Sequence, residues 1–320
     1  LSGLRIHGLR RGIFLIGFEL PGFWRKDVYM SSLRASPTSH SYFSQGLRLH
    51  YLDWGNPEAP PLLLVHGNRD HCHNWDWVAQ ELRDEYHILA PDFRGHGDSE
   101  HIKGGNYSHT GYLYDLAQLI HQQNLAPLKI VAHSLGGSVA LRYAGTYPEN
   151  VEKMVVIEGT GGPSWLYQEV PVHERIQSFV DSTRGSAGRT PRRYATLEEA
   201  FERMRTENKH LSEAQARHLT VHGSNQNEDG TYSWKFDNQT HVMAPFDLTL
   251  AQTQQLWSRI NAPLLLISGS ESEFGRHQPG DPAEHFNNAR SVCFDHAGHW
   301  VQHDQLDRFV GEVREFFKGE

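Results

Sequence analysis

The sequence has few cysteines, no long hydrophobic run and no excess of basic residues. Its 320 residues include two cysteines, Cys72 and Cys293, which are too few for a disulfide framework. They fit either a reducing compartment, for which we expect the cytoplasm, or a protein indifferent to redox state. No apolar stretch approaches the roughly 20 residues that a membrane-spanning helix needs. Thirty basic and 38 acidic residues give a net charge of −8, whereas a nucleic-acid binder normally carries a basic face. These absences favour a protein that acts on a small molecule.

Histidine is the residue type in excess. The 22 histidines make up about 7% of the chain, roughly three times the share expected of an average protein. Imidazole serves both as a general base and as a metal ligand near neutral pH. The excess therefore indicates either base catalysis or metal binding.

The first 34 residues differ in composition from the rest. Six Lys or Arg and two acidic residues surround a short apolar run at 13–18, which is too short for a signal peptide or a membrane span. An Arg-rich segment is compatible with an organellar transit peptide. Met30, which is followed by polar residues, instead favours a native start there, with residues 1–29 as an upstream extension. We expect residues 1–34 to lie outside the fold.

From Ser41 onward, predicted strands and helices alternate. Residues 42–43 and 47–52 predict an antiparallel pair that turns at Gln45-Gly46. Continuous apolar runs predict buried strands at 61–65, 87–90, 128–132, 154–157, 264–267 and 291–294. Helical patterns lie between them at 75–83, 112–123, 136–147 and 305–317. This order predicts an α/β fold with a doubly wound, mostly parallel sheet.

Residues 162–255 interrupt this alternation. Their helical patterns, at 174–181, 197–208 and 213–220, are polar, and no strong strand accompanies them. Too polar to hold a core of its own, the segment predicts a helical lid on a sheet domain formed by residues 41–161 and 256–320. Such lids cover the carboxyl ends of the strands, where open α/β sheets bind ligands. The aromatic residues of the lid either line an apolar pocket or anchor the lid; they are Trp165, Tyr167, Phe179, Tyr232, Trp234 and Phe236.

The strongest local pattern, VAHSLGG at 131–137, follows a predicted strand and precedes a helix. It fits a nucleophile elbow, a strand-to-helix turn so tight that the residues two positions either side of the nucleophile must be small. Ala132 and Gly136 meet that requirement, although Ala132 replaces the usual first glycine. The positive end of the following helix faces any anion that forms. We therefore predict Ser134 as the nucleophile; the alternative is an ordinary strand-turn-helix junction.

Two further loops complete a resemblance to a known family. HGN at 66–68 follows one predicted strand, and DFRGHGDS at 92–99 follows the next. With these loops, the sequence resembles the α/β-hydrolase family from about Ser41 to Lys318. The resemblance implies that the backbone N–H groups of Asn68 and Leu135 form an oxyanion hole. We interpret the 92–99 loop as structural, because its glycines suit tight turns.

The same resemblance places the catalytic base in the Gly-His-Trp loop near the C-terminus, which makes His299 the predicted base. The chain order of nucleophile, acid and histidine is then kept. His299 and His303 have the spacing of a zinc-binding pair, but no Glu follows His299 as the zincin motif requires. His71-Cys72-His73 has ligand types without a paired second cluster, so we interpret it as solvated loop residues. We predict neither a metal nor a cofactor.

The acid of the triad has two candidates. The family usually shows Gly-x-x-Asp after the strand at 264–267, but Ser272 occupies that position and Glu273 comes one residue later. Glu158 directly follows the strand at 154–157, where some family members place their acid. A charged residue at the end of an apolar strand is hard to explain by packing. This favours Glu158 over Glu273.

The predicted activity is that of a serine hydrolase. His299 removes the proton of Ser134, which attacks a carbonyl carbon, and water then releases the acyl group from the enzyme. We expect the partner to be a carboxylic ester of small to medium acyl chain, with no nucleic acid and no membrane span involved. A homo-oligomer is compatible with this sequence.

The sequence leaves three other functions to consider. A carbon–carbon bond hydrolase of ring-fission (meta-cleavage) diketones is the main alternative, since that class resembles esterases in elbow, histidine loop and lid. Residues 66–68 and Trp75 resemble the halide-binding segment of dehalogenases and epoxide hydrolases, but those enzymes need a carboxylate nucleophile where this sequence has Ser134. A non-catalytic binding protein is disfavoured, because Ser134 and His299 are both intact.

Overall fold

The computed structural model of the chain describes residues 36–104, 106–160, 170–187, 189–242, 244–276 and 281–319. The predicted extension at 1–34 lies outside these residues, as do Trp165 and Tyr167. Over the ranges described, no helix combines the length and apolar character needed to cross a bilayer.

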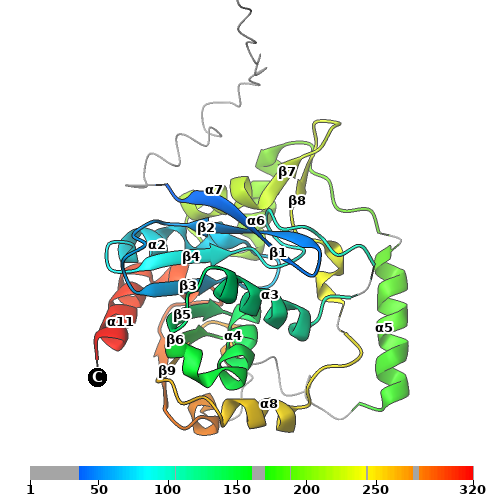
Figure 1. Cartoon of the computed structure of the whole chain (residues 1–320). Helices are drawn as coiled ribbons and strands as arrows, with labels where there is room; N and C mark the ends of the chain where they lie inside the picture. Colours follow the sequence, from blue (N-terminus) through cyan, green and yellow to red (C-terminus); the bar gives the residue numbers. More distant parts are fainter. Residues whose placement is uncertain are drawn as a thin grey trace, which may run out of the picture.

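An eight-stranded sheet forms the centre of the fold, in the order β1-β2-β4-β3-β5-β6-β9-β10 (Figure 1). The strands are β1 (Thr38–Ser44), β2 (Leu47–Asp53), β3 (Pro61–Val65), β4 (His87–Pro91), β5 (Leu128–His133), β6 (Val151–Ile157), β9 (Leu264–Gly269) and β10 (Ala289–Phe294). β2 runs antiparallel to β1 and β4, and from β4 to β10 all neighbours are parallel. The predicted α/β fold with a mostly parallel sheet is confirmed.

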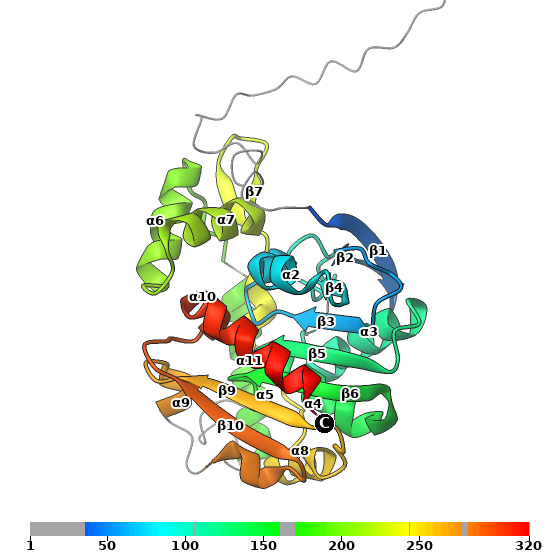
Figure 2. The same ribbon diagram turned by 90° about the vertical axis from the view of Figure 1, so that its left-hand side faces the viewer.

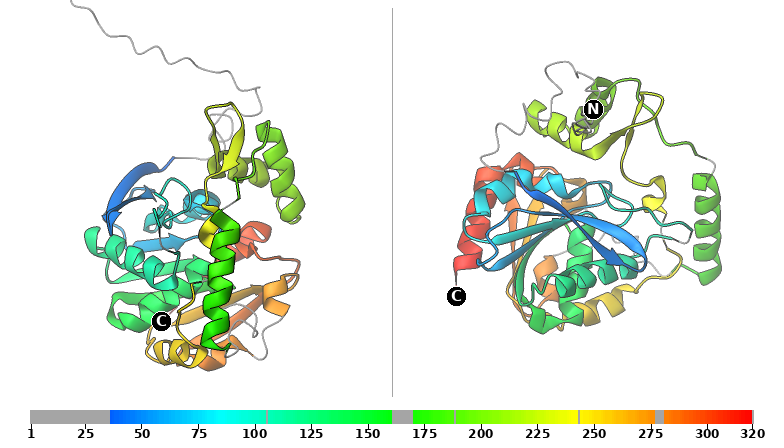
Figure 3. Two further views of the ribbon diagram at one scale, coloured as in Figure 1. Left: turned by 90° about the vertical axis from the view of Figure 1, so that its right-hand side faces the viewer. Right: turned by 45° about the horizontal axis from the view of Figure 1, so that its top comes forward.

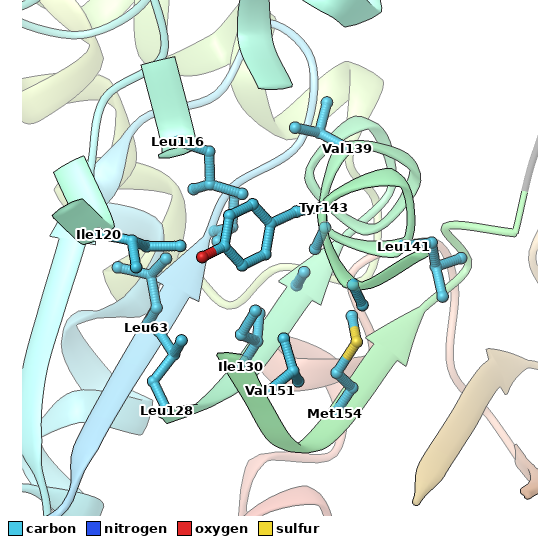
Figure 4. Close-up of a cluster of buried hydrophobic side chains, with 14 of the residues drawn as sticks. Leu63, Leu116, Ile120, Leu128, Ile130, Val139, Leu141, Tyr143, Val151 and Met154 are labelled. Carbon is cyan, nitrogen blue, oxygen red and sulfur yellow. The ribbon is translucent and has the colours of Figure 1, made fainter. Parts of the chain in front are cut away.

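Helices cover both faces of the sheet. α3 (His109–Gln122), α4 (Leu135–Thr146) and α8 (Leu250–Trp257) cover one face, and α2 (Asp76–Leu82) and α11 (Leu306–Lys318) cover the other (Figures 1 and 2). Alternate residues of one strand enter opposite layers: Leu63 packs with α3 and α4, and Leu64 with α2 and α11. Figure 4 shows the first of these cores, around Tyr143. Burial on both faces explains why the parallel strands read as continuous apolar runs.

The remaining short elements join the larger ones. They are η1 (Cys72–Trp75), η2 (Pro148–Asn150), α9 (Glu273–Arg276), η5 (Pro282–His285) and α10 (Val301–Asp304). η1 leads directly into α2, and α10 precedes α11.

A helical cap joins the sheet domain (Figures 1 to 3). It comprises α5 (Val172–Ala187), α6 (Leu197–Glu207), α7 (Glu213–Gly223), the hairpin of β7 (Ser224–Gln226) and β8 (Tyr232–Trp234), and η4 (Asn238–His241). α6, α7 and the β7–β8 hairpin lie over one end of the sheet domain, and α5 lies along its side. α7 begins at a capping box, in which Ser212 and Gln215 bond each other's backbone N–H groups.

The expectation that the cap has no core of its own is wrong. α6 and α7 enclose a small cluster of buried side chains: Leu197, Phe201, Leu211, Ala216 and Leu219. The apolar residues recur at helical spacing among charged ones, so average polarity concealed them. The cap boundary predicted at residue 255 also falls inside α8. This helix packs on the sheet domain, where Gly145 of α4 lies so close to Leu256 that a Cβ would approach its carbonyl oxygen to 2.4 Å.

Candidate active site

Ser134 lies in a sharp turn between β5 and α4. Its backbone has φ 50° and ψ −117°, a region that residues other than glycine rarely occupy. Close packing encloses the turn: a Cβ on Gly136 would lie 2.5 Å from the carbonyl oxygen of His66, and one on Gly137 would lie 2.8 Å from the Cα of Gly159. The steric requirement inferred for an elbow therefore holds on the helix side of Ser134.

Glu158 directly follows β6 and has a second strained backbone, at φ 47°. Its side chain is 1% exposed. The carboxylate receives hydrogen bonds from distant parts of the chain: His299 Nδ1 lies 2.5 Å from Oε2, and the N–H of Gly269, at the end of β9, donates to Oε1 at 3.0 Å. Glu273, the rival acid, is exposed at the start of α9. The structure thus brings Glu158 to the predicted base across 141 positions of sequence.

Ser272 takes part in this arrangement, which the sequence reasoning missed. Its buried hydroxyl donates to Glu158 Oε2 at 2.5 Å. Ser272 occupies the position where the family usually has its acid, so a neutral donor there now binds a carboxylate supplied by another strand. The Gly-x-x-Ser spacing at Gly269–Ser272 was the signal that could have indicated this role, because the family places a triad residue at that position, facing the catalytic histidine.

We expect Ser272→Ala to lower kcat/KM for ester hydrolysis by about 10-fold to 100-fold. The substitution removes one donor from a buried carboxylate, and a hydrogen bond to a charged group contributes about 1.5–3 kcal/mol. Steady-state kinetics would measure the loss. Ser270→Ala is the control, because the Ser270 hydroxyl in the same loop accepts from the backbone of His296 instead. Equal losses in both variants would show that the Ser272 bond to Glu158 has no special importance.

His133 holds the loop that carries His299. Its Nε2 lies 2.9 Å from the carbonyl oxygen of His299, and the two rings are 4.5 Å apart between centroids. Burial, together with the nearby His299, lowers the pKa of His133 well below its ordinary value, so the ring is neutral and donates through Nε2–H. Phe274 stacks on the His299 ring at 4.4 Å.

The residues of the two predicted oxyanion donors belong to segments that form or contact the elbow. Leu135 is the first residue of α4, where backbone N–H groups are not used by the helix itself. Asn68 follows β3 and lines the same cavity as Ser134. The loop before it is tightly packed on the elbow, since a Cβ on Gly67 would lie 3.2 Å from the Cβ of Ser134.

A cavity of about 350 Å³ contains Ser134 and His299 in its lining, a volume within the range of small-molecule sites. Its cap side includes Trp234 and Phe236. Of the other predicted lid aromatics, Tyr232 packs on the cap core and Phe179 is half-buried on α5. The aromatic residues of the cap therefore divide between pocket lining and anchoring.

The interpretation of residues 71–73 as solvated is wrong. His71 and Cys72 are buried, because α7 of the cap packs over this loop and His71 Nε2 lies 3.1 Å from the carbonyl oxygen of Leu219. Burial lowers the pKa of His71 to about 3. Trp75 is also fully buried, so it does not reach the cavity as a halide-binding residue would.

The 92–99 loop has the structural role inferred for it. Asp92 is buried and accepts from the backbone N–H groups of Cys72 and Asp98 at 2.7 and 2.9 Å, and from His50 Nδ1 at 2.7 Å. Burial acts to raise the pKa of Asp92, but these hydrogen bonds hold it well below its usual value. Gly97 is required there, because a Cβ would lie 2.2 Å from the carboxyl group.

Asp70, also in the cavity lining, is expected to make stability fall as pH rises. Burial raises the pKa of Asp70 to about 8, against about 3.9 in an unfolded chain. Between these two pKa values the folded state holds a proton that the unfolded state has lost. The contribution of Asp70 to the free energy of unfolding is therefore full below about pH 4, and it is lost as pH rises through 8. Asp70→Asn mimics the protonated form. Urea unfolding at pH 5, 6.5 and 8 would measure the free energy of unfolding of both proteins. The value for the variant, relative to wild type, should rise by up to about 1.4 kcal/mol per pH unit. A difference that does not change with pH would contradict this expectation.

Comparison with known proteins agrees with the fold. A family model described as alpha/beta hydrolase fold matches residues 60–306. The esterase Rv0045c of Mycobacterium tuberculosis is 27% identical over 272 residues, covering 82% of this chain and 84% of the esterase. Epoxide hydrolase 3 of Mus musculus is 32% identical over 137 residues, which cover 42% of this chain and 37% of that protein.

Among solved structures, the thioesterase domain from the curacin biosynthetic pathway superposes with a TM-score of 0.77 at 23% identity, covering 88% of this chain and all of that domain. Its likeness concerns the fold alone. The family match and the esterase relative support a hydrolase. Since the family model spans most of the sheet domain together with the cap, this chain belongs to the α/β-hydrolase fold family.

Proposed function

We propose that the protein is a serine hydrolase of carboxylic esters with small to medium acyl groups. Ser134 is the nucleophile, His299 the general base and Glu158 the acid that orients the base. The observation that carries this proposal is the 2.5 Å contact between Glu158 and His299, beside a strained serine that shares a cavity with His299. The esterase relative is consistent with it.

The reaction begins when His299 Nε2 takes the proton of the Ser134 hydroxyl. The serine oxygen attacks the ester carbonyl carbon, and the tetrahedral intermediate collapses to an acyl-enzyme as the alcohol leaves with the proton from His299. Water, deprotonated by the same histidine, then releases the acid. Glu158 does not take a proton; its carboxylate fixes the Nδ1–H tautomer and stabilises the imidazolium.

The negative charge of the tetrahedral intermediate develops next to the start of α4. Backbone N–H groups of Leu135 and Asn68 are the donors in this proposal, and removing one such donor in a related arrangement costs about 10²–10³ in kcat. The dipole of α4 adds to their effect. Because the donors are backbone groups, stabilisation of this charge depends on the backbone geometry of the two loops. The side chains of Asn68 and Leu135 are not required for it.

Two other hydrolytic reactions occur on related folds or residues. Epoxide hydrolase 3 is a relative, but epoxide opening through an alkyl-ester intermediate needs a carboxylate nucleophile, and the elbow holds Ser134. Hydrolases of a carbon–carbon bond in ring-fission diketones resemble esterases in elbow, histidine loop and lid. Substrate turnover, not residue identity, separates this second reaction from ester hydrolysis.

A substrate panel tests the proposal. p-Nitrophenyl esters of increasing acyl length would be assayed beside a ring-fission diketone and an epoxide, with Ser134→Ala protein as the blank. We expect hydrolysis of the short and medium esters, with kcat/KM falling once the acyl chain outgrows the cavity of about 350 Å³. Turnover of the diketone or the epoxide with no ester hydrolysis would overturn the proposal.

A further inference from the structure

Three histidines and an aspartate meet where the cap rests on the sheet domain, outside the lining of the cavity that contains Ser134. His73 and Asp76 come from η1 and the start of α2, and His218 and His222 lie one turn apart on α7 of the cap. α7 lies beside α2 in Figures 1 and 2. Each residue offers one ligand atom, and these four atoms lie within 4.8 Å of one another. The cap thus supplies the second ligand pair that the sequence around His73 lacks.

The carboxylate of Asp76 is the centre of the cluster. His73 Nδ1 and His218 Nε2 approach the same oxygen, Oδ2, at 2.8 and 2.9 Å. The rings of His73 and His222 stack with centroids 3.7 Å apart, and those of His218 and His222 are 4.5 Å apart. Three imidazoles therefore crowd around one carboxylate.

One oxygen of the buried carboxylate is left without a partner by these contacts. The Asp76 side chain is completely buried and that of His218 is 3% exposed. The second carboxylate oxygen, Oδ1, is buried and has no hydrogen-bond partner within the described ranges. Buried polar atoms are normally satisfied, and an exception needs a physical explanation such as a bound ion.

We propose that His73, Asp76, His218 and His222 bind one divalent transition-metal ion of the zinc type. Three imidazole nitrogens and one carboxylate oxygen are ligands that Zn²⁺ takes, usually in a tetrahedron with bonds of about 2.0–2.2 Å. That geometry places ligand atoms roughly 3.3 Å apart, so small side-chain movements close the present cluster around an ion. Four protein ligands leave no open position, and the site is therefore structural rather than catalytic.

A second group of metal-ligating residues is the weaker candidate. His50, Cys72 and Asp92 also converge. Asp92 already accepts from His50 Nδ1 and from two backbone N–H groups, so its hydrogen bonding is satisfied without an ion. This second group also offers three ligands, whereas the cluster around Asp76 offers four. We assign the metal to the cluster around Asp76.

An ion there would fix one wall of the substrate cavity. α7 carries both His218 and His222, and its Leu219 and Gly223 line the cavity that contains Ser134. Gly223 lies against His71, since a Cβ there would be 3.0 Å from His71 Nε2. Coordination bonds to one ion would connect α7 of the cap to η1 and the start of α2. The inferred site is independent of whether the cavity hydrolyses esters.

Metal binding is tested on the purified full chain after chelator treatment. Zn²⁺ would be titrated against a chromophoric chelator, and Co²⁺ would report the geometry through its visible absorption. We expect one equivalent to bind, a tetrahedral Co²⁺ spectrum and a Zn²⁺-dependent rise in the melting temperature. His222→Asn and His73→Asn should each weaken Zn²⁺ binding on the order of 100-fold or more.

Two controls separate this cluster from other sites. His121→Asn makes the same change at an exposed helical histidine, and Cys72→Ser removes a ligand of the second group; both should bind as wild type does. No stoichiometric binding by the folded wild-type chain, or an octahedral Co²⁺ spectrum, would overturn the proposal. So would wild-type affinity in His222→Asn or His73→Asn. Circular dichroism identifies a variant that has not folded, and the wild-type stoichiometry and spectrum still decide the question.

Discussion

Ser134→Ala is expected to lower kcat for ester hydrolysis by about 10⁶-fold, the scale of nucleophile removal in serine hydrolases. The alanine side chain has no oxygen to attack the carbonyl, so no acyl-enzyme forms. The fold should be unaffected, because the turn is held by backbone contacts: Ser134 N–H donates to the carbonyl oxygen of Ile157 at 2.8 Å, and the glycines at 136 and 137 are unchanged. Ester hydrolysis and thermal unfolding would be measured on the same preparation.

Ser138→Ala is the matched control for this prediction. Ser138 lies one turn later on α4, and its hydroxyl contacts Arg142. We expect hydrolysis within a few-fold of wild type in this variant. Retention of more than a small fraction of wild-type hydrolysis by Ser134→Ala would mean that another residue is the nucleophile.

Glu158→Gln is expected to lower kcat by about 10⁴-fold, as replacement of the acid does in other triads. Three donors converge on this carboxylate, from His299, Ser272 and Gly269. Glutamine has one acceptor oxygen, so its amide NH₂ must face at least one of these donors. The imidazole then loses its fixed tautomer and the negative charge that stabilises its protonated form. Steady-state kinetics with the best ester of the panel would measure the loss.

Glu273→Gln distinguishes the two candidate acids. The substitution is chemically identical, and Glu273 lies on the exposed first turn of α9. We expect little change in kcat. The reverse result, with activity lost in Glu273→Gln and kept in Glu158→Gln, would mean that the loop after β9 supplies the acid and that Glu158 has a structural role.

Local patterns were sufficient to predict the fold, because the parallel strands are buried on both faces. The strand predicted at 61–65 is β3, and the one predicted at 264–267 lies within β9. β6 begins three residues before its prediction. Two polar residues near its start, Glu152 and Lys153, end the apolar run. Lys153 nevertheless pairs with Lys129 of β5, and Glu152, at a shift in the register, forms an ion pair with Lys129. Strand ends at the sheet margin need not be apolar, so composition misses them.

The candidate site was predictable where one short segment carries the geometry. The elbow needs small residues within a few positions of Ser134, and a single sequence displays them. Ser272 and the cluster around Asp76 were not predictable in this way. Ser272 matters through a carboxylate 114 positions away, and His218 reaches Asp76 across 142 positions. Both contacts depend on how loops from different strands and the cap come together, which no local pattern records.

Trapping the covalent intermediate tests the central claim, that Ser134 is the nucleophile of an acyl-transfer hydrolase. The wild-type chain would be treated with a fluorophosphonate, and intact mass and peptide mapping would locate the adduct. We predict one phosphonyl group per chain on Ser134, loss of ester hydrolysis in proportion to labelling, and no adduct in Ser134→Ala. An adduct on another residue, or ester hydrolysis that continues after complete labelling of Ser134, would contradict the account.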